Sequence, residues 1–390
     1  MCEDNQTEVI EFLLLGFQGL HNYRFLLFVV FLLLYVAILT GNLLIIILVT
    51  VNGHLHIPMF YFLKHLALAD VVVTTCIVPL MLDVTIMEGR RISFVGCIVQ
   101  LYVFAICVFV QCLLLAVMSY DRYLAICNPL SYALIMVPNV CLLLVLGSWL
   151  LVFTLGSSEI FLLCQLYFCG RNDINHFFCD FGPLVELSSS DTSRLLMLDL
   201  IMSIPILFSP LVFIITTYIL IFFTIVNIPS KGGREKFFST CGPHLITVCT
   251  YYGTLIMVYT VQSDENSFNI NKFRSLLYIV GTPLMNPIIY SFRNQELKAA
   301  LRKVDAALGG IHMAVVWGRP LGISISLRIT DVSKQFERAG ISPYLIIKRD
   351  TQNSQKATAD LRKMQGTLGY SGISYFGYAS ELPYTLKNMR

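Results

Sequence analysis

The chain has 390 residues, of which 56% are hydrophobic and only 13% are charged. Soluble domains carry about 25% charged residues, so this composition excludes an ordinary soluble domain and is typical of a membrane protein. The net charge of +3 says little about partners, and we expect no nucleic-acid binding.

No residue pattern in the chain predicts catalysis. Twelve cysteines in 390 residues do not make a disulfide scaffold, and most of them lie within apolar runs. There is no metal-ligand spacing, phosphate-binding loop, nucleophile elbow or internal repeat. We therefore expect a protein that is not an enzyme and that holds no cofactor or metal.

The first 24 residues are mixed and acidic and do not form a signal peptide, which needs a basic region followed by a short apolar one. The first apolar segment is therefore expected to direct its own insertion into the membrane. Asn5-Gln6-Thr7 is a glycosylation acceptor at Asn5, which requires residues 1–24 to be extracellular.

Seven long apolar segments follow. About 20 apolar residues at ~1.5 Å per residue cross the ~30 Å hydrocarbon core, and a backbone in lipid must satisfy its own hydrogen bonds, which favours helices. The expected spans are residues 25–51, 62–87, 97–122, 140–161, 195–226, 237–261 and 273–292, with a short basic loop at 229–236. The sequence thus predicts an all-α membrane protein with a seven-transmembrane helix bundle over residues 25–292.

The third span ends on an acid and a base side by side. No charge occurs from Ile98 to Tyr120, and Asp121 and Arg122 then stand where the helix should leave the membrane. Ionisable groups at membrane depth are costly and need partners or a task. They are either two charges that reach water at a helix end, or a switch in which Asp121 holds Arg122 at rest and releases it toward a cytoplasmic partner.

Two further segments follow the seventh span. In residues 293–304, Leu297, Ala300, Leu301 and Val304 share one helical face, which predicts a short amphipathic helix on the inner membrane surface. Residues 305–390 hold no segment apolar enough to span, and their one alternating stretch, 322–329, is too short for a domain. This tail is expected to be a mostly disordered cytoplasmic extension; a small partner-binding module and sequence appended by a faulty gene model are the alternatives.

Six motifs together resemble one receptor family in their order and spacing. They are GNLL at Gly41–Leu44, PMFYFL…LALAD at Pro58–Asp70, MSYDRYLAICNPLSY at Met118–Tyr132, HFFCD at His176–Asp180, KFFSTCGPH at Lys236–His244 and NPIIYSFRN at Asn286–Asn294. On these motifs residues 1–304 resemble the vertebrate odorant receptors, which are rhodopsin-like G-protein-coupled receptors. Tyr123, PMFYFL and HFFCD are similar to the land-vertebrate branch, and the tail has no counterpart.

The resemblance implies a topology and a set of partners. It places the N-terminus outside and the Asp121-Arg122 pair inside the plasma membrane, with sensory-neuron cilia as the expected location; the distribution of Lys and Arg supports this orientation only weakly. The implied partners are the lipid bilayer, a small volatile and mostly apolar odorant, and a heterotrimeric G protein of the stimulatory class, whose activation raises cyclic AMP.

The resemblance also implies an inner switch and an interior polar network. The switch is expected to comprise Asp121, Arg122, Tyr123, Tyr218, His244 and Tyr290, and the network Asn42, Asp70, Gln111 and Asn286. Tyr218 and Tyr290 are expected to meet Arg122 in the open state, and His244 to contact the G protein. The family usually carries an acid where Gln111 stands, so Asp70 is the only carboxylate there and strong cation binding is disfavoured.

Cys97 and Cys179 are expected to form the family's disulfide on the outer, oxidising side. The chain departs from the family at Cys169, whose usual partner is a later cysteine, because Ser188-Ser189-Ser190 stand at that place. Cys169 is therefore expected either to pair with Cys164 or to stay free, with a looser loop.

The outer halves of the helices offer an apolar lining with a few hydroxyls, as small-molecule sites usually do. The expected ligand contacts are Phe104, Ala105, Val108, Phe109, Ile206, Tyr252, Leu255, Tyr259 and Tyr278. Asp199 is either a carboxylate at the wet mouth of the bundle or a pocket-entrance group that favours amine-bearing odorants, since a buried carboxylate needs a partner. Receptors for amine hormones carry an acid where Phe104 stands, so that ligand class loses support.

Two other functions compete with that of an odorant receptor. A channel or transporter is disfavoured by the odd number of spans, the lack of an inverted repeat and the Asp121-Arg122 pair. A non-signalling or orphan receptor stays open, because the missing loop cysteine, Gln111 and the tail are unusual.

Overall fold

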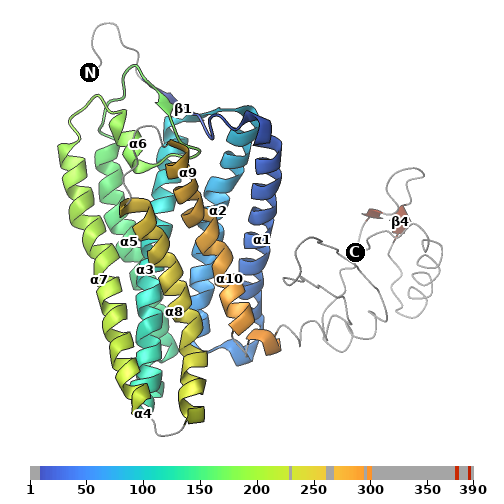
Figure 1. The fold of residues 1–390 in the computed structure, drawn as a ribbon, viewed down its shortest axis with the longest axis vertical. Coiled ribbons are helices and arrows are strands. Elements are labelled where there is room, and N and C mark those ends of the chain that lie inside the picture. The colour runs from blue at the N-terminus through green and yellow to red at the C-terminus, as the bar shows by residue number, and fades with distance from the viewer. Residues whose placement is uncertain are drawn as a thin grey trace. The chain divides into compact units, whose positions relative to one another are not determined.

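A computed structural model shows the fold (Figure 1). It describes residues 9–227, 231–260, 268–293, 297–300, 374–376 and 385–387. The chain divides into two compact units, Met1–Lys298 and Ala299–Arg390. The first unit contains the predicted spans, so the sites discussed below belong to it.

Among the described residues, six helices of the first unit are long and apolar enough to cross a membrane. They are α1 (Arg24–Val51), α2 (Pro58–Met87), α3 (Phe94–Cys127), α5 (Pro138–Leu163), α7 (Ser193–Val226) and α8 (Lys231–Thr260). A seventh crossing is built from three consecutive pieces: α9 (Phe268–Leu276), a π-helical segment (Leu277–Gly281) and α10 (Thr282–Arg293). The predicted seven-transmembrane bundle is confirmed, and its helices run side by side along the long axis of the unit (Figure 1).

The seventh crossing changes its helical winding next to a proline. Pro283 has no N–H, so the carbonyl of Ile279, one turn earlier, cannot receive the usual helical hydrogen bond. Such a position favours a wider turn, and Ile279 lies inside the π-helical segment. The carbonyl of Pro283 in turn accepts a hydrogen bond from Asn42 Nδ2 of α1 at 3.0 Å.

Two helix boundaries differ from the prediction. Helix α3 continues past Arg122 to Cys127 and ends just before Asn128 and Pro129, because the residue before a proline disfavours helical geometry. Residues 231–236, which we expected in a basic loop, form the first turns of α8 instead. Adding a turn to an existing helix costs less than nucleating one, so polar residues can extend it.

A small sheet caps one end of the bundle, and the sequence analysis did not predict it. Strand β1 (Glu11–Leu14) lies between β2 (Arg90–Ser93), to which it is antiparallel, and β3 (Asp173–Ile174), to which it is parallel. The alternate residues Phe12 and Leu14 are fully buried, as expected when successive side chains point to opposite faces. We call this the sheet end of the bundle and the opposite one the Arg122 end.

Short elements complete the described part of the chain. They are the 3₁₀ turns His21–Tyr23 and Gly53–Leu55, α4 (Pro129–Ile135) at the Arg122 end, α6 (Phe181–Glu186) at the sheet end, and the antiparallel pair β4 (Ser374–Phe376) and β5 (Thr385–Lys387) in the second unit. Of the predicted surface helix at 293–304, residues 297–300 are described as helical, with Leu297 and Ala300 buried. Asn5 and most of the tail at 305–390 lie outside the described residues.

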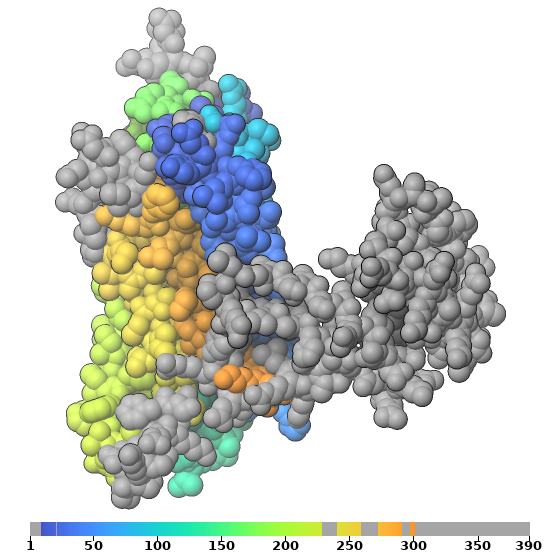
Figure 2. Space-filling model, turned by 45° about the vertical axis from the view of Figure 1, so that its right-hand side comes forward, coloured from blue at the N-terminus to red at the C-terminus, as the bar shows by residue number. Residues whose placement is uncertain are grey.

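Helices α1 and α10 approach each other closely at a glycine. A Cβ atom added to Gly41 would lie 2.8 Å from the Cβ of Pro287, which is closer than real Cβ atoms come. Figure 2 shows α1 in blue beside the orange of the seventh crossing on one face. Small residues at such contacts allow two helices in a membrane to pack closely.

We expect Gly41→Ala to lower the melting temperature of the purified receptor, because overpacking a tight contact costs roughly 1–3 kcal/mol. Gly147→Ala is the matched control, since Gly147 is also helical and an added Cβ meets nothing within 4 Å. Equal melting temperatures for the two variants would contradict this packing argument.

Candidate functional site

A disulfide fixes the loop between α5 and α7 to the sheet end of α3. Cys97 and Cys179 are bonded as expected, and both are fully buried. Gln100, one turn along α3, accepts a hydrogen bond from the backbone N–H of Cys179 at 3.0 Å and donates one to the carbonyl of Cys76 at 3.1 Å. The residues on either side of Cys179 are therefore held in place over the bundle.

The structure corrects both expectations for Cys169. Cys169 is disulfide-bonded, so it does not stay free, and its partner is not Cys164, which is a free and exposed thiol. The loop around it is also packed rather than loose: Phe168 and Ile174 are buried in one apolar cluster with Phe12 and Cys179. The sequence analysis weighed only Cys164 and the position of Ser188-Ser189-Ser190 as places for a partner, so it did not predict this bond.

A small cavity of about 30 Å³ lies between this loop and the helices, and we call it the loop cavity. It is lined by Phe104, Val108, Phe178, Asp180, Leu255, Val258, Ser275, Tyr278 and Ile279. Four of these were predicted as ligand contacts: Phe104, Val108, Leu255 and Tyr278. They come from α3, α8 and the seventh crossing, so the fold brings together three segments that are distant in sequence.

Of the remaining predicted ligand contacts, those whose side chains the structure describes do not line the loop cavity, and all of them stay predictions. Ile206 and Tyr252 are buried, Ala105 and Phe109 are half-buried, and the side chain of Tyr259 lies outside the described residues. Asp199 accepts a hydrogen bond from Ser203 Oγ, one turn further along α7, at 2.6 Å. This hydroxyl supplies the partner that an isolated carboxylate in an apolar helix requires.

Asp180 is the one acidic residue among the described residues that line the loop cavity, and it was not among the predicted ligand contacts. Its Oδ1 accepts a hydrogen bond from the backbone N–H of Phe181 at 2.9 Å, at the start of α6. Burial raises the pKa of Asp180 to about 6, and this hydrogen bond opposes part of the rise. Its position next to the disulfide cysteine in HFFCD is the signal that could have identified it.

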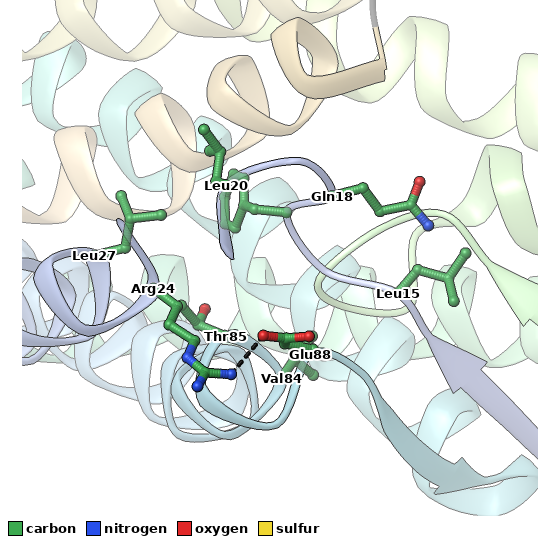
Figure 3. A pocket seen from close by; sticks show the side chains of 9 residues that line it. Leu15, Gln18, Leu20, Arg24, Leu27, Val84, Thr85 and Glu88 are labelled. Atoms are coloured by element: carbon green, nitrogen blue, oxygen red, sulfur yellow. Dashed lines mark hydrogen bonds and ion pairs between the residues drawn. The ribbon is translucent and has the colours of Figure 1, made fainter. Parts of the chain in front are cut away.

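A second cavity, of about 360 Å³, lies at the edge of the sheet end, and we call it the rim cavity (Figure 3). It is lined by Leu15, Phe17, Gln18, Leu20, Arg24, Leu27, Val84, Thr85 and Glu88. None of these residues also lines the loop cavity. The rim cavity is the larger of the two, but the loop cavity holds the predicted contacts and lies within the bundle, so we take the loop cavity as the candidate odorant site.

The interior polar network is centred on Asp70. Its Oδ1 accepts a hydrogen bond from Gln111 Nε2 at 2.9 Å, and its Oδ2 accepts one from Asn286 Nδ2 at 2.7 Å. Tyr278, which lines the loop cavity, donates to Gln111 Oε1 at 3.4 Å. The network therefore runs from the cavity to the middle of α2 and α10.

Asn42, the fourth predicted member, does not reach this carboxylate. Its amide donates instead to the carbonyls of Ile38 and Pro283, both at 3.0 Å, which links α1 to α10. Tyr251 is a residue that sequence reasoning missed: its hydroxyl donates to the carbonyl of Val108 at 2.6 Å and lies 3.1 Å from Cys112 Sγ. Tyr251 thereby ties α8 to α3 next to the loop cavity.

At the Arg122 end, Asp121 holds Arg122 as the switch interpretation requires. Arg122 Nε donates to Asp121 Oδ2 at 2.9 Å, Nη2 donates to the same oxygen, and Tyr132 of α4 donates to Asp121 Oδ1 at 2.8 Å. Asp121 is fully buried and Arg122 is 8% exposed. The pair is thus not a set of solvated charges at a helix end.

His244, for which a contact with the G protein stays a prediction, is buried in this structure. Its Nε2 lies 3.1 Å from the carbonyl of Leu115, and its Nδ1 lies 2.7 Å from the hydroxyl of Tyr218. A carbonyl can only accept, so Nε2 carries the proton and Nδ1 accepts from Tyr218. This arrangement joins α3, α7 and α8, and the two ring nitrogens find partners inside the bundle.

The two other tyrosines of the predicted switch are packed among the helices. Tyr123 packs against a buried cluster of Ile221, Ile225 and Cys241 from α7 and α8. Tyr290 of α10 is fully buried, and its hydroxyl has no hydrogen-bond partner among the described residues.

Comparison with known proteins identifies the family. A sequence model of the olfactory receptor family matches residues 31–306. The chain belongs to the olfactory receptor family. Olfactory receptor 11L1 of Homo sapiens is 45% identical over 311 residues, which cover 80% of this chain and 97% of that relative. Olfactory receptor 1f45 of Rattus norvegicus is 43% identical over 306 residues, which cover 78% and 98% respectively.

Membership confirms several expectations from the sequence. This olfactory receptor is a multi-pass membrane protein and a G-protein-coupled receptor, and the family is not enzymatic. An odorant and a G protein are the partners that the family implies. The tail beyond residue 306 lies outside the family match, as the sequence analysis expected.

We expect Asp70→Ala to lower the melting temperature of the purified receptor more than Asp70→Asn. Alanine leaves the amides of Gln111 and Asn286 buried without their acceptor, at about 1–3 kcal/mol for each lost partner, whereas asparagine keeps one accepting oxygen. The comparison uses receptor in one detergent at one pH. If both variants melt at the same temperature, the carboxylate does not hold the network.

Proposed function

We propose that this olfactory receptor binds small, mostly apolar volatile molecules in the loop cavity and activates a G protein of the stimulatory class, which raises cyclic AMP. Its sheet end faces outward, with the N-terminus outside, and the Arg122 end faces the cytoplasm, in the plasma membrane of sensory-neuron cilia. The observation that carries the proposal is Tyr278, which both lines the loop cavity and hydrogen-bonds to Gln111.

The shape of the loop cavity links binding to movement. Its volume of about 30 Å³ is far below the ~300 Å³ or more of ordinary small-molecule pockets, so an odorant must displace side chains that line it. Phe104 and Tyr278 form an edge-to-face pair with ring centroids 6.0 Å apart, and Tyr278 forms another with Tyr251 at 5.9 Å. An odorant that separates these rings moves the hydroxyl that reaches Gln111.

The interior network carries this movement toward the Arg122 end. A shift of Gln111 changes its hydrogen bond to Asp70, which also holds Asn286 of α10. Val108, Gln111 and Leu115 lie on successive turns of α3, and the carbonyl of Leu115 holds His244. Release of Tyr218 from His244, and of Arg122 from Asp121, then allows Tyr218 and Tyr290 to meet Arg122 in the open state.

The direct test is cyclic AMP in cells that express the receptor and are given an odorant panel, with membrane current recorded in parallel. A response in cyclic AMP supports the proposal. A current without cyclic AMP would point to a channel, and no response to any odorant at normal surface expression would point to a receptor that does not signal.

For the switch, we expect Asp121→Asn to raise basal cyclic AMP, because the amide holds Arg122 less strongly than the carboxylate does. Tyr132→Phe removes one hydrogen bond to Asp121 and should raise basal signalling less. Arg122→Ala should abolish odorant-evoked cyclic AMP at measurable surface expression. Normal signalling by Arg122→Ala would refute the switch assignment.

Asp180 and Asp199 give a matched pair of carboxylates for testing ligand selectivity. Asp180 lines the loop cavity, whereas Asp199 is engaged by Ser203. We expect Asp180→Asn to shift potency for amines and alcohols by about several-fold relative to hydrocarbons, as a half-wet charge interaction of ~1 kcal/mol implies. Asp199→Asn should shift it less. A larger selective shift for Asp199→Asn would place Asp199, not Asp180, at the ligand.

A further inference from the structure

The rim cavity is preformed by residues that the odorant site does not use. It lies between the segment after β1, the first turns of α1 and the last turn of α2, and its volume of about 360 Å³ falls within the ~300–1,000 Å³ range of small-molecule pockets. Figure 3 shows Leu20 and Leu27 on one side of the cavity and Gln18 and Leu15 on another. Arg24, the first residue of α1, is paired there with Glu88, the residue that follows α2.

The segment after β1, Leu15 to Phe17, covers the rim cavity, and we call it the roof. Several hydrogen bonds hold it in place. The backbone N–H groups of Leu15 and Gly16 donate to the carbonyls of Ile174 and His176 at 3.0 and 3.1 Å, and Lys272 Nζ donates to the carbonyl of Gly16 at 2.6 Å. Gly16 has a φ of +63°, and a Cβ there would lie 2.6 Å from Val84 Cγ1. Only glycine allows this close approach, so the segment is seated firmly on α2.

Aromatic packing closes the roof beside these hydrogen bonds. The ring of Phe17 stacks on Phe177 with centroids 5.3 Å apart, and it also contacts Phe273 of α9 at 5.3 Å and Phe31 of α1 at 5.8 Å. The roof therefore joins the N-terminal segment to the α5–α7 loop, to α9 and to α1. An occupant of the rim cavity would press on a structure that also borders the loop cavity through Phe178 and Asp180.

The residues that line the rim cavity favour an uncharged ligand with one apolar part and one polar group. Five apolar residues form one part of the lining, namely Leu15, Phe17, Leu20, Leu27 and Val84. Arg24 and Glu88 form an ion pair, so an ammonium or a carboxylate ligand would have to compete with a counter-charge that is already in place. A guanidinium has five N–H donors, and among the described residues the hydrogen bond of Arg24 goes to Glu88 through Nη1 alone, so other donors are available to an accepting oxygen.

We propose that the rim cavity is a second small-molecule site, separate from the odorant site, for uncharged molecules with a short apolar chain and one hydrogen-bond-accepting oxygen, such as alkanols, aldehydes and ketones. Its occupant modulates the receptor through the roof. A lipid chain with its ester oxygen offers the same chemistry, so the experiment must separate a soluble ligand from a lipid.

The test is photolabelling of the purified full-length receptor in lipid nanodiscs with a photoactivatable eight-carbon alkanol, followed by peptide mass spectrometry. We expect label on the peptides around residues 15–27 and 84–88, displaced by excess octanol. Leu27→Trp, which fills the cavity, should reduce the label by about tenfold. Leu26→Trp is the control, because Leu26 is 59% exposed and does not line the cavity, and it should keep the label within about twofold.

Arg24→Met keeps the chain volume and removes the donors, so it separates loss of binding from loss of folding. It should weaken displacement by octanol by about fivefold while leaving displacement by octane unchanged. Label that survives Leu27→Trp, or an equal loss for Leu26→Trp, would overturn the proposal. Label that excess octanol does not displace would mean that a lipid occupies the cavity. Labelling needs no signalling, so its outcome is independent of the odorant response.

Discussion

Buried polar groups in a membrane bundle must find partners within the protein, and in this receptor α3 supplies many of them. Gln100 holds the disulfide loop, Gln111 binds Asp70, and Arg122 binds Asp121. Backbone carbonyls of α3 serve as well, since Val108 accepts from Tyr251 and Leu115 from His244. These hydrogen bonds connect α3 to α2, to α8 and to the loop between α5 and α7.

Hydrogen bonds that involve α3 occur at both ends of the bundle. At the sheet end, Tyr278 belongs both to the lining of the loop cavity and to the Gln111–Asp70 network. At the Arg122 end, His244 and Tyr218 close one contact, and Asp121 and Tyr132 hold Arg122. Packed interiors change between discrete arrangements rather than bending continuously, so paired groups along one helix can act as a two-state element.

The sheet end has an architecture of its own. Strand β1 brings the N-terminal segment into contact with the residues after α2 and with the loop before α6, and the disulfide anchors that loop to α3. The same cap therefore covers the loop cavity on one side and encloses the rim cavity on the other.

The sequence by itself determined the seven spans, the acid–base pair at Asp121-Arg122 and the membrane class, because hydrophobic length and the cost of charge in lipid are local properties. Family motifs added the disulfide between Cys97 and Cys179 and the polar residues of the interior. The tertiary structure alone decided which carboxylate borders the cavity: Asp180, at the start of α6, lines it, whereas Asp199, within α7, accepts a hydrogen bond from Ser203. It also decided that His244 is buried, that Cys169 is disulfide-bonded, that Tyr251 ties α8 to α3, and that β1 lies between β2 and β3. Each of these depends on the rotation and offset of segments far apart in the chain, and no local pattern of residues encodes them.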